Sequence, residues 1–221
     1  EGSGIKCGMP ATEGAIEKIT LDSEGRAHYG VIGGGKPKGL CGSGLVDLLA
    51  DLFIRGIIDR NGKFKEPTSS PRIVESEEGP AFLVEQGDKT HWGSPLLLTE
   101  RDIANLIRTK GAIFSACSLL LKNVGLLPDA MDSFYIAGSF GQSLNIENAV
   151  RIGLLPDLPR ERFHYIGNSS LTGAYLILLS EKNGEFAEQT AQKMTYVELN
   201  TEPRYMNELT GSLFLPHTDI E

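Results

Sequence analysis

The sequence predicts an α/β fold, a mixed sheet with helices on both faces, and three observations support this class. Segments with the alternating apolar residues of strands are separated by segments with the 3.6-residue periodicity of helices. Twice, a short apolar strand runs into a glycine turn that leads into a helix. The 221 residues are 40% hydrophobic and 23% charged, the composition of a globular chain. Strands that alternate with helices indicate a layered α/β architecture.

The first quarter of the chain is predicted to form a hairpin followed by a helix. Residues 14–21 alternate apolar and polar side chains, and residues 27–32 are expected to pair back on them across a turn. A glycine-dense loop over 33–44 leads into the helix. The apolar face of this helix carries Leu45, Leu48, Leu49, Leu52 and Phe53 at helical spacing. Its opposite face carries Asp47, Asp51 and Arg55.

Residues 63–98 are expected to be a surface insertion, because they are polar and contain several prolines. Within this insertion, residues 73–74 and 81–84 have the composition of two short strands. The acidic run 75–78 between them is expected to be a solvated loop.

The longest helix is predicted over Thr99–Val124. Thr99 and Asp102 have the spacing of a capping box at its start, and Gly125 is expected to end it. The apolar residues Ile103, Leu106, Ile107 and Phe114 begin its buried face.

Two strand–turn–helix units follow. In the first, strand 134–137 enters the turn 138–141, and a helix begins after Asn145. In the second, strand 165–166 enters a turn, and Ser169 or Ser170 is expected to cap a helix over 171–179. The remaining elements expected are a helix over 185–194 and a strand over 196–199.

Composition excludes several classes of protein. A net charge of −8 disfavours nucleic-acid binding, which needs clustered Lys and Arg, and no apolar run approaches the roughly 20 residues of a membrane span. The cysteines Cys7, Cys41 and Cys117 lie far apart without a CxxC, and no His has metal-ligand spacing, so no metal site is expected. Unpaired thiols suit a reducing cytoplasm. Because the chain begins at Glu1 and not at Met, we expect either a removed tag or a piece of a longer protein.

Of four glycine turns, one fails as a phosphate loop and three are candidate ligand sites. Gly30–Lys36 fits a phosphate loop until Pro37, which replaces the Ser or Thr that would bind magnesium. The turn before Leu45 could present backbone N–H groups to an anion, or Ser43 could simply cap its own helix while the glycines allow close packing. Ligands in open α/β sheets bind at the carboxyl ends of strands, which favours the turn after 134–137. The turn after 165–166 is of the same type and adds support, but a tight strand-to-helix turn explains it better. The candidate binding residues are Gly42, Ser43, Gly44, Lys110, Gly138, Ser139, Phe140, Gly141, Gly167 and Asn168.

Eight segments together resemble one family, the C-terminal part of the ferredoxin-linked reductive activators of corrinoid (iron–sulfur) proteins. The order and spacing of these segments carry the resemblance, which covers nearly the whole chain. They are residues 1–9, 13–16, 39–44, 98–103, 136–141, 152–156, 167–174 and 213–217.

The resemblance implies a ribonuclease-H-like lobe of the acetate/sugar kinase, heat-shock cognate and actin (ASKHA) ATPase superfamily. The parent protein would use ATP with Mg²⁺ to drive the reduction of an inactive Co(II) corrinoid protein to Co(I). Its electron would come from a [2Fe–2S] cluster in an N-terminal ferredoxin domain. By resemblance, Gly138–Gly141 corresponds to the adenosine motif, and the long helix Thr99–Val124 flanks the adenine. From its position midway along this helix, Lys110 could reach a nucleotide or could simply lie on the solvated helix face.

The chain departs from the family pattern in lacking the phosphate motifs and the cluster cysteines. We therefore expect residues 1–221 to be the second lobe of the ATPase region, which does not hydrolyse ATP by itself. The expected partners are a corrinoid protein, the other lobe and ferredoxin domain of the parent, and a second copy of the chain. No catalytic residue can be assigned. The alternatives are a lobe of a small-molecule kinase of the same superfamily, or a non-catalytic interaction module.

Overall fold

The computed structural model describes residues 4–65, 70–138, 141 and 143–218 and confirms the α/β class. The described strands are β1 (Ala15–Leu21), β2 (Ala27–Val31), β3 (Gly39–Leu40), β4 (Ile73–Ser76), β5 (Gly79–Glu85), β6 (Leu96–Thr99), β7 (Phe134–Ala137) and β8 (Phe163–Gly167). The described α-helices are α1 (Gly42–Ile54), α2 (Glu100–Asn123), α4 (Ile146–Arg151), α5 (Ser169–Leu179), α6 (Glu181–Lys193) and α7 (Tyr205–Ser212).

The strands of the described residues form three sheets, where the sequence predicted a single mixed sheet. The first has the order β2-β1-β3, with the predicted β1–β2 hairpin antiparallel and β3 parallel to β1. The second, β4-β5-β6, is antiparallel throughout. The third is the parallel pair β7–β8, which joins the two strand–turn–helix units that the sequence predicted.

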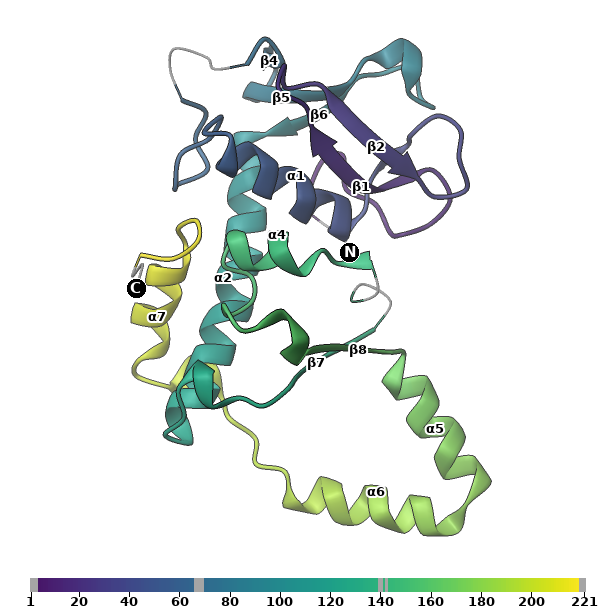
Figure 1. Ribbon diagram of the computed structural model, residues 1–221, viewed down its shortest axis with the longest axis vertical. Helices are drawn as coiled ribbons and strands as arrows, with labels where there is room; N and C mark the ends of the chain where they lie inside the picture. The colour runs from purple at the N-terminus through teal and green to yellow at the C-terminus, as the bar shows by residue number, and fades with distance from the viewer. Residues whose placement is uncertain (1–3, 66–69, 139–140, 142, 219–221) are drawn as a thin grey trace.

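The long helix α2 connects the two ends of the molecule. Figure 1 shows the first two sheets and α1 around its N-terminal end, α4 below α1 near the middle of α2, and β7 and β8 beside its C-terminal half. The C-terminal helix α7 packs along α2, whereas α5 and α6 project away from the rest of the molecule. The core follows this arrangement, since its buried residues extend from β1 and α1 through β5 and β6 to α4.

The segment 63–98 is only partly the surface insertion that the sequence predicted. Its first strand, β4, lies at the surface, but Phe82 and Val84 of β5 and Leu98 of β6 are fully buried in the core. The polar loops around these strands dominate the composition of residues 63–98, so the composition does not indicate that β5 is buried. The second sheet is therefore part of the main packing unit.

The helix ends follow from side-chain caps. The predicted capping box at α2 is confirmed: the Thr99 hydroxyl accepts from the Asp102 N–H, and the Asp102 carboxylate accepts from the Thr99 N–H, both at 3.1 Å. The prediction that Ser169 or Ser170 caps α5 is wrong. Asn168 Oδ1 accepts from the Leu171 N–H at 3.1 Å, so the helix begins at Ser169.

Two further predictions differ from the structure, and one helix was not predicted. Residues 196–198 form no strand, because the sequence signal is local and no other described strand pairs with them. Asp47, expected on the solvent face of α1, is buried. Helix α7 was not predicted at all, since its only strong contacts are with the distant α2.

Candidate functional site

The carboxyl ends of β7 and β8 lie side by side at one edge of the parallel pair. Ala137 pairs with Gly167, and the N–H of Gly138 donates to the carbonyl oxygen of Gly167 at 2.7 Å. Both glycines have left-handed backbone conformations, with φ of +92° at Gly138 and +65° at Gly167. A Cβ at Gly138 would meet no heavy atom within 4 Å. The two predicted turns are therefore adjacent, with open space over the Gly138 backbone.

The N-terminus of α5 begins at this same edge. Asn168 uses its side chain to cap the helix, so this residue shapes the edge and its Oδ1 is already engaged. The next residues are Ser169 and Ser170, and no acidic residue occurs in the first helical turn. The described turn residues are uncharged, so this edge offers glycine backbone and the first N–H groups of α5 and no charged side chain.

The rest of the predicted turn divides into two parts. Ser139 and Phe140, predicted to contact a ligand, lie outside the described residues. Gly141 is buried, and a Cβ there would come within 2.6 Å of the Ile136 Cγ2 atom. Gly141 is therefore small because it packs against β7.

The turn before α1 is occupied by packing contacts with β1. Gly44 is buried, and a Cβ on it would overlap the carbonyl oxygen of Ile16. Ser43 donates to the carbonyl oxygen of Glu17 at 2.8 Å. The interpretation that Ser43 caps its helix is wrong, because Cys41 is the N-cap and makes no side-chain capping bond. Of the two open interpretations of this turn, the structure supports close packing, with Gly42 half-buried beside it.

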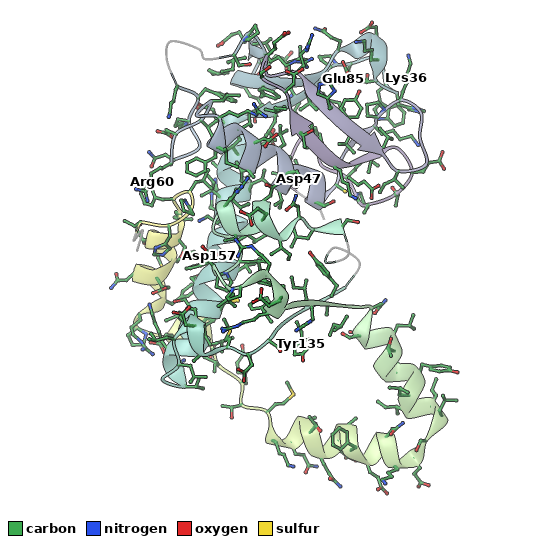
Figure 2. The ribbon with its side chains drawn as sticks, viewed as in Figure 1. Lys36, Asp47, Arg60, Glu85, Tyr135 and Asp157 are labelled. Atoms are coloured by element: carbon green, nitrogen blue, oxygen red, sulfur yellow. The ribbon has the colours of Figure 1, made fainter. Side chains whose placement is uncertain are left out.

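Helix α1 is nevertheless joined to the helix that follows the Gly138 turn. Asn148 of α4 donates to Asp47 Oδ1 of α1 at 2.7 Å, and both residues are buried. Figure 2 shows Asp47 between the two helices. Burial raises the pKa of the Asp47 carboxyl, while the bond from Asn148 opposes this shift. No sequence signal marked this pair, because its members are a hundred residues apart.

Lys110 does not reach a ligand edge in this structure. Its side chain is buried, and Nζ donates to the carbonyl oxygens of Phe214 and Pro216, each at 2.5 Å. Burial lowers the pKa of Lys110 to about 8. The lysine thus attaches α2 to the segment 213–217.

The same segment is fixed from two other directions. The carbonyl oxygen of Arg60, a residue that follows α1, accepts from the Leu215 N–H at 2.9 Å, and Arg60 Nε donates to the Leu215 carbonyl at 3.2 Å. Gly153, which follows α4, packs so closely that a Cβ there would overlap the Pro216 backbone. Two of the segments that carry the family resemblance, 152–156 and 213–217, therefore meet each other.

A surface hollow beside the turn after β1 contains none of the predicted site residues. Its arginines already have partners: Arg26 bonds to Asp22, and Arg72 donates to the Leu83 carbonyl at 2.9 Å. The hollow is lined by Asp22, Ser23, Glu24, Gly25, Arg26, Arg55, Ile57, Ser70, Pro71 and Arg72.

Neither a metal centre nor a membrane span occurs within the described residues. Among these there is no cluster of three or more His, Cys, Asp or Glu side chains placed to hold a metal ion. Likewise, no described helix combines the length and apolar character that a bilayer crossing requires. The thiols of Cys7 and Cys41 are buried, and burial raises the pKa of Cys7 to about 12.

Comparison with known proteins identifies close relatives in structure and sequence. A solved structure of a reductive activator for corrinoid, iron–sulfur protein superposes on 99% of this chain with a TM-score of 0.93 and 46% sequence identity. The corrinoid activation enzyme RamQ of Eubacterium limosum is 34% identical over 213 residues, which are 93% of this chain. The [Co(II) methylated amine-specific corrinoid protein] reductase of Methanosarcina barkeri is 24% identical over 216 residues, which are 88% of this chain.

The chain is much shorter than these relatives. It spans 35% of the solved activator and 36% of each of the two sequence relatives. A family model described as the C-terminal domain of RACo, the ASKHA domain, matches residues 1–221. The predicted resemblance is thus confirmed over the whole chain, and the protein belongs to the family of the C-terminal ASKHA domain of RACo.

Proposed function

We propose that this chain is the C-terminal lobe of an ATP-dependent activator that returns an inactive Co(II) corrinoid protein to Co(I). The names of three relatives support this proposal, since they describe corrinoid activation, a Co(II) corrinoid protein reductase and a reductive activator. In the parent protein an upstream [2Fe–2S] ferredoxin domain would donate the single electron that Co(II) gains. The proposed partners are the corrinoid protein, the other ATPase lobe, the ferredoxin domain and a second copy, in the cytoplasm.

The observation that carries the nucleotide proposal is the paired glycine edge. Gly138 and Gly167 lie next to each other, and the space over Gly138 is open. The flat, neutral adenine ring of the nucleotide fits such an edge, because glycine lets the ring approach the backbone. The described turn residues there carry no cation for the phosphates, so we propose that the other lobe binds Mg²⁺ and the phosphate groups.

The role of ATP in this proposal is to favour one arrangement of the two lobes. A nucleotide shifts a conformational equilibrium only by its difference in affinity for the two states. A site divided between lobes supplies that difference, because only the closed arrangement contacts both ends of the nucleotide. In this chain, α1 and α4 are joined through Asp47 and Asn148, so the two ends of the lobe are expected to move together.

The test compares two glycines of the same backbone class in the full-length parent. Gly138 and Gly125 both have positive φ, and a Cβ added to either glycine would meet no heavy atom within 4 Å. Gly138→Ala should weaken ATP binding at least about tenfold, because its methyl occupies the space proposed for the ring. Gly125→Ala carries a similar backbone strain and should leave ATP affinity unchanged.

Two measurements separate binding from folding. Calorimetric titration gives the ATP affinity of each variant, and thermal unfolding shows whether the two substitutions cost similar stability. The absorbance change of the corrinoid then reports ATP-dependent formation of Co(I). Equal ATP affinity in Gly138→Ala and the unmodified parent would overturn the proposed adenosine site.

A further inference from the structure

Helix α5 has the composition of a buried helix but lies in the open. Its sequence is apolar around the whole circumference, a pattern typical of helices that other elements surround. No residue of α5 is buried, and Leu171 and Leu178 are 67% and 85% exposed. Within the described residues its main contact is α6, the next helix along the chain. Most of the apolar surface of α5 is therefore uncovered.

The parallel pair β7–β8 is uncovered on one of its two faces. Parallel sheets are normally buried on both faces, and two strands alone are too few to form a stable sheet. Tyr165 and Ile166 are consecutive, so they point to opposite faces of β8, and both are exposed. Tyr135 of β7 is 63% exposed, and Figure 2 shows it at the open side of the strand. The face that carries Phe134, Ile136 and Phe163 packs on the core, so among the described residues the open face is the one that carries Tyr135 and Ile166.

These two surfaces form one region, which we call the docking face: the strands β7 and β8 together with α5. Chain order joins them, since β8 leads into α5 through Gly167 and Asn168. Figure 1 shows α5 and α6 projecting from the end of β8, away from the upper sheets and α2. The docking face thus combines free strand edges, which can pair with another backbone, with an apolar helix that can cover a sheet.

We infer that the docking face is completed by strands from the upstream part of the same parent chain. This inference rests on the proposal that the chain functions within a longer protein. The relatives are nearly three times as long, and the matching family model describes a C-terminal domain, so the additional length precedes the matched region. Strands added at a free edge of β7–β8 extend the parallel sheet, and α5 then covers one face of it. In this arrangement the docking face and the upstream strands together form one buried core.

Hydrogen exchange tests this inference directly. Amide exchange is compared between the 221-residue chain and a longer chain that carries the upstream segment. In the longer chain, the amides of α5 and of β7 or β8 should exchange at least about tenfold more slowly. The amides of α2 serve as the internal control, because α2 is already packed against α7 and β6 and should change little.

A matched pair of substitutions provides the second test. Leu178→Glu replaces a docking-face residue, and Leu127→Glu replaces a residue outside that face with a similar exposure of 75%. Both should leave the melting temperature of the 221-residue chain within about 1 °C. In the longer chain, only Leu178→Glu should lower the melting temperature, by roughly 5 °C or more, because it places a charge in a completed core.

The outcomes are distinct. Unchanged exchange of α5 in the longer chain, or equal effects of the two substitutions there, would overturn the inference. Protection of α5 in the 221-residue chain that increases with concentration, together with a dimer mass, would overturn it too and assign the face to a second copy. ATP is absent from all these measurements. A failed adenosine-site test would therefore not affect the inference about the docking face, and a failed docking-face test would not affect the proposed adenosine site.

Discussion

Gly44 shows how one residue type can serve either a ligand or a neighbouring backbone. In the first turn of α1 its Cα faces the carbonyl of Ile16 in β1, and no side chain fits between them. Gly138 has the opposite environment, since its Cα faces open space. Gly44 lies in the first turn of a helix, whereas Gly138 lies in a turn with positive φ, so both the backbone conformation and the distance to a neighbouring element separate their roles.

Substitution of Gly44 should therefore affect stability. Gly44→Ala is expected to lower the free energy of unfolding by about 1–3 kcal/mol, because β1 and α1 must move apart. Gly30→Ala is the control, since its Cβ would meet nothing within 4 Å, and its effect should stay within about 0.5 kcal/mol. Urea denaturation of the two variants measures the difference. A Gly44→Ala protein as stable as the control would contradict the packing role.

At the scale of elements, the segment 213–217 joins three parts of the chain. Arg60 after α1, Lys110 of α2 and Gly153 after α4 all contact its backbone. Of the two cationic residues, Lys110 is the one whose side chain is fully buried. Its Nζ donates to the carbonyl oxygens of Phe214 and Pro216. A substitution at Lys110 should therefore loosen the segment from α2.

Lys110→Met should lower the free energy of unfolding by about 2 kcal/mol at pH 7, because the partly buried carbonyls of Phe214 and Pro216 lose their donor. The effect should also depend on pH. The folded-state pKa of Lys110 is lowered to about 8, whereas an unfolded lysine keeps its proton to about 10.5. The unfolded chain thus binds more protons between these values, and the contribution of Lys110 to stability rises as the pH increases from about 8 to 10.5.

Since Met does not titrate, the stability gap between the unmodified chain and Lys110→Met should widen over this pH range. Urea denaturation at several pH values between about 7 and 10.5 measures the gap. Lys122→Met on the same helix is the control at pH 7, where removal of its exposed bond to Glu208 should cost less than about 1 kcal/mol. A gap that stays constant with pH would contradict the lowered pKa.

At the scale of the whole molecule, the lobe has two unequal ends. The end that holds β1, α1, β5 and β6 has a continuous buried core, whereas the end that holds β7, β8 and α5 is largely exposed. The proposed adenosine edge lies at the exposed end. Nucleotide binding and completion of the docking face therefore concern the same part of the molecule.

The isolated chain should accordingly bind ATP weakly, with a Kd in roughly the millimolar range or above. In our proposal the described edge holds only the adenine ring, and the phosphates and Mg²⁺ are bound by the other lobe. Calorimetric titration of the 221-residue chain and of the longer chain compares the two affinities. Micromolar binding by the 221-residue chain would show that this lobe holds the nucleotide by itself.

Local signals account for the parts of the fold that were predicted. Helical periodicity gave α1 and α2, the spacing of Thr99 and Asp102 gave the capping box, and two strand–turn–helix patterns gave β7 and β8 with their turns. The candidate edge at Gly138 and Gly167 was among these predictions, because a glycine turn at a strand end is visible in a few consecutive residues. The order of the weak motifs also identified the family.

Contacts between distant residues decided the rest. Lys110 was predicted to reach a ligand, yet its partners are residues 104 and 106 positions away, and no local pattern shows this. The burial of β5, the division into three sheets and the packing role of Gly44 likewise depend on which segments meet. The sequence by itself determined the helices other than α7, the turns at the strand ends and the family, because these follow from neighbouring residues. Only the tertiary structure decided which glycine is open, which lysine is buried and which apolar helix is uncovered, because burial is a property of the whole packed molecule.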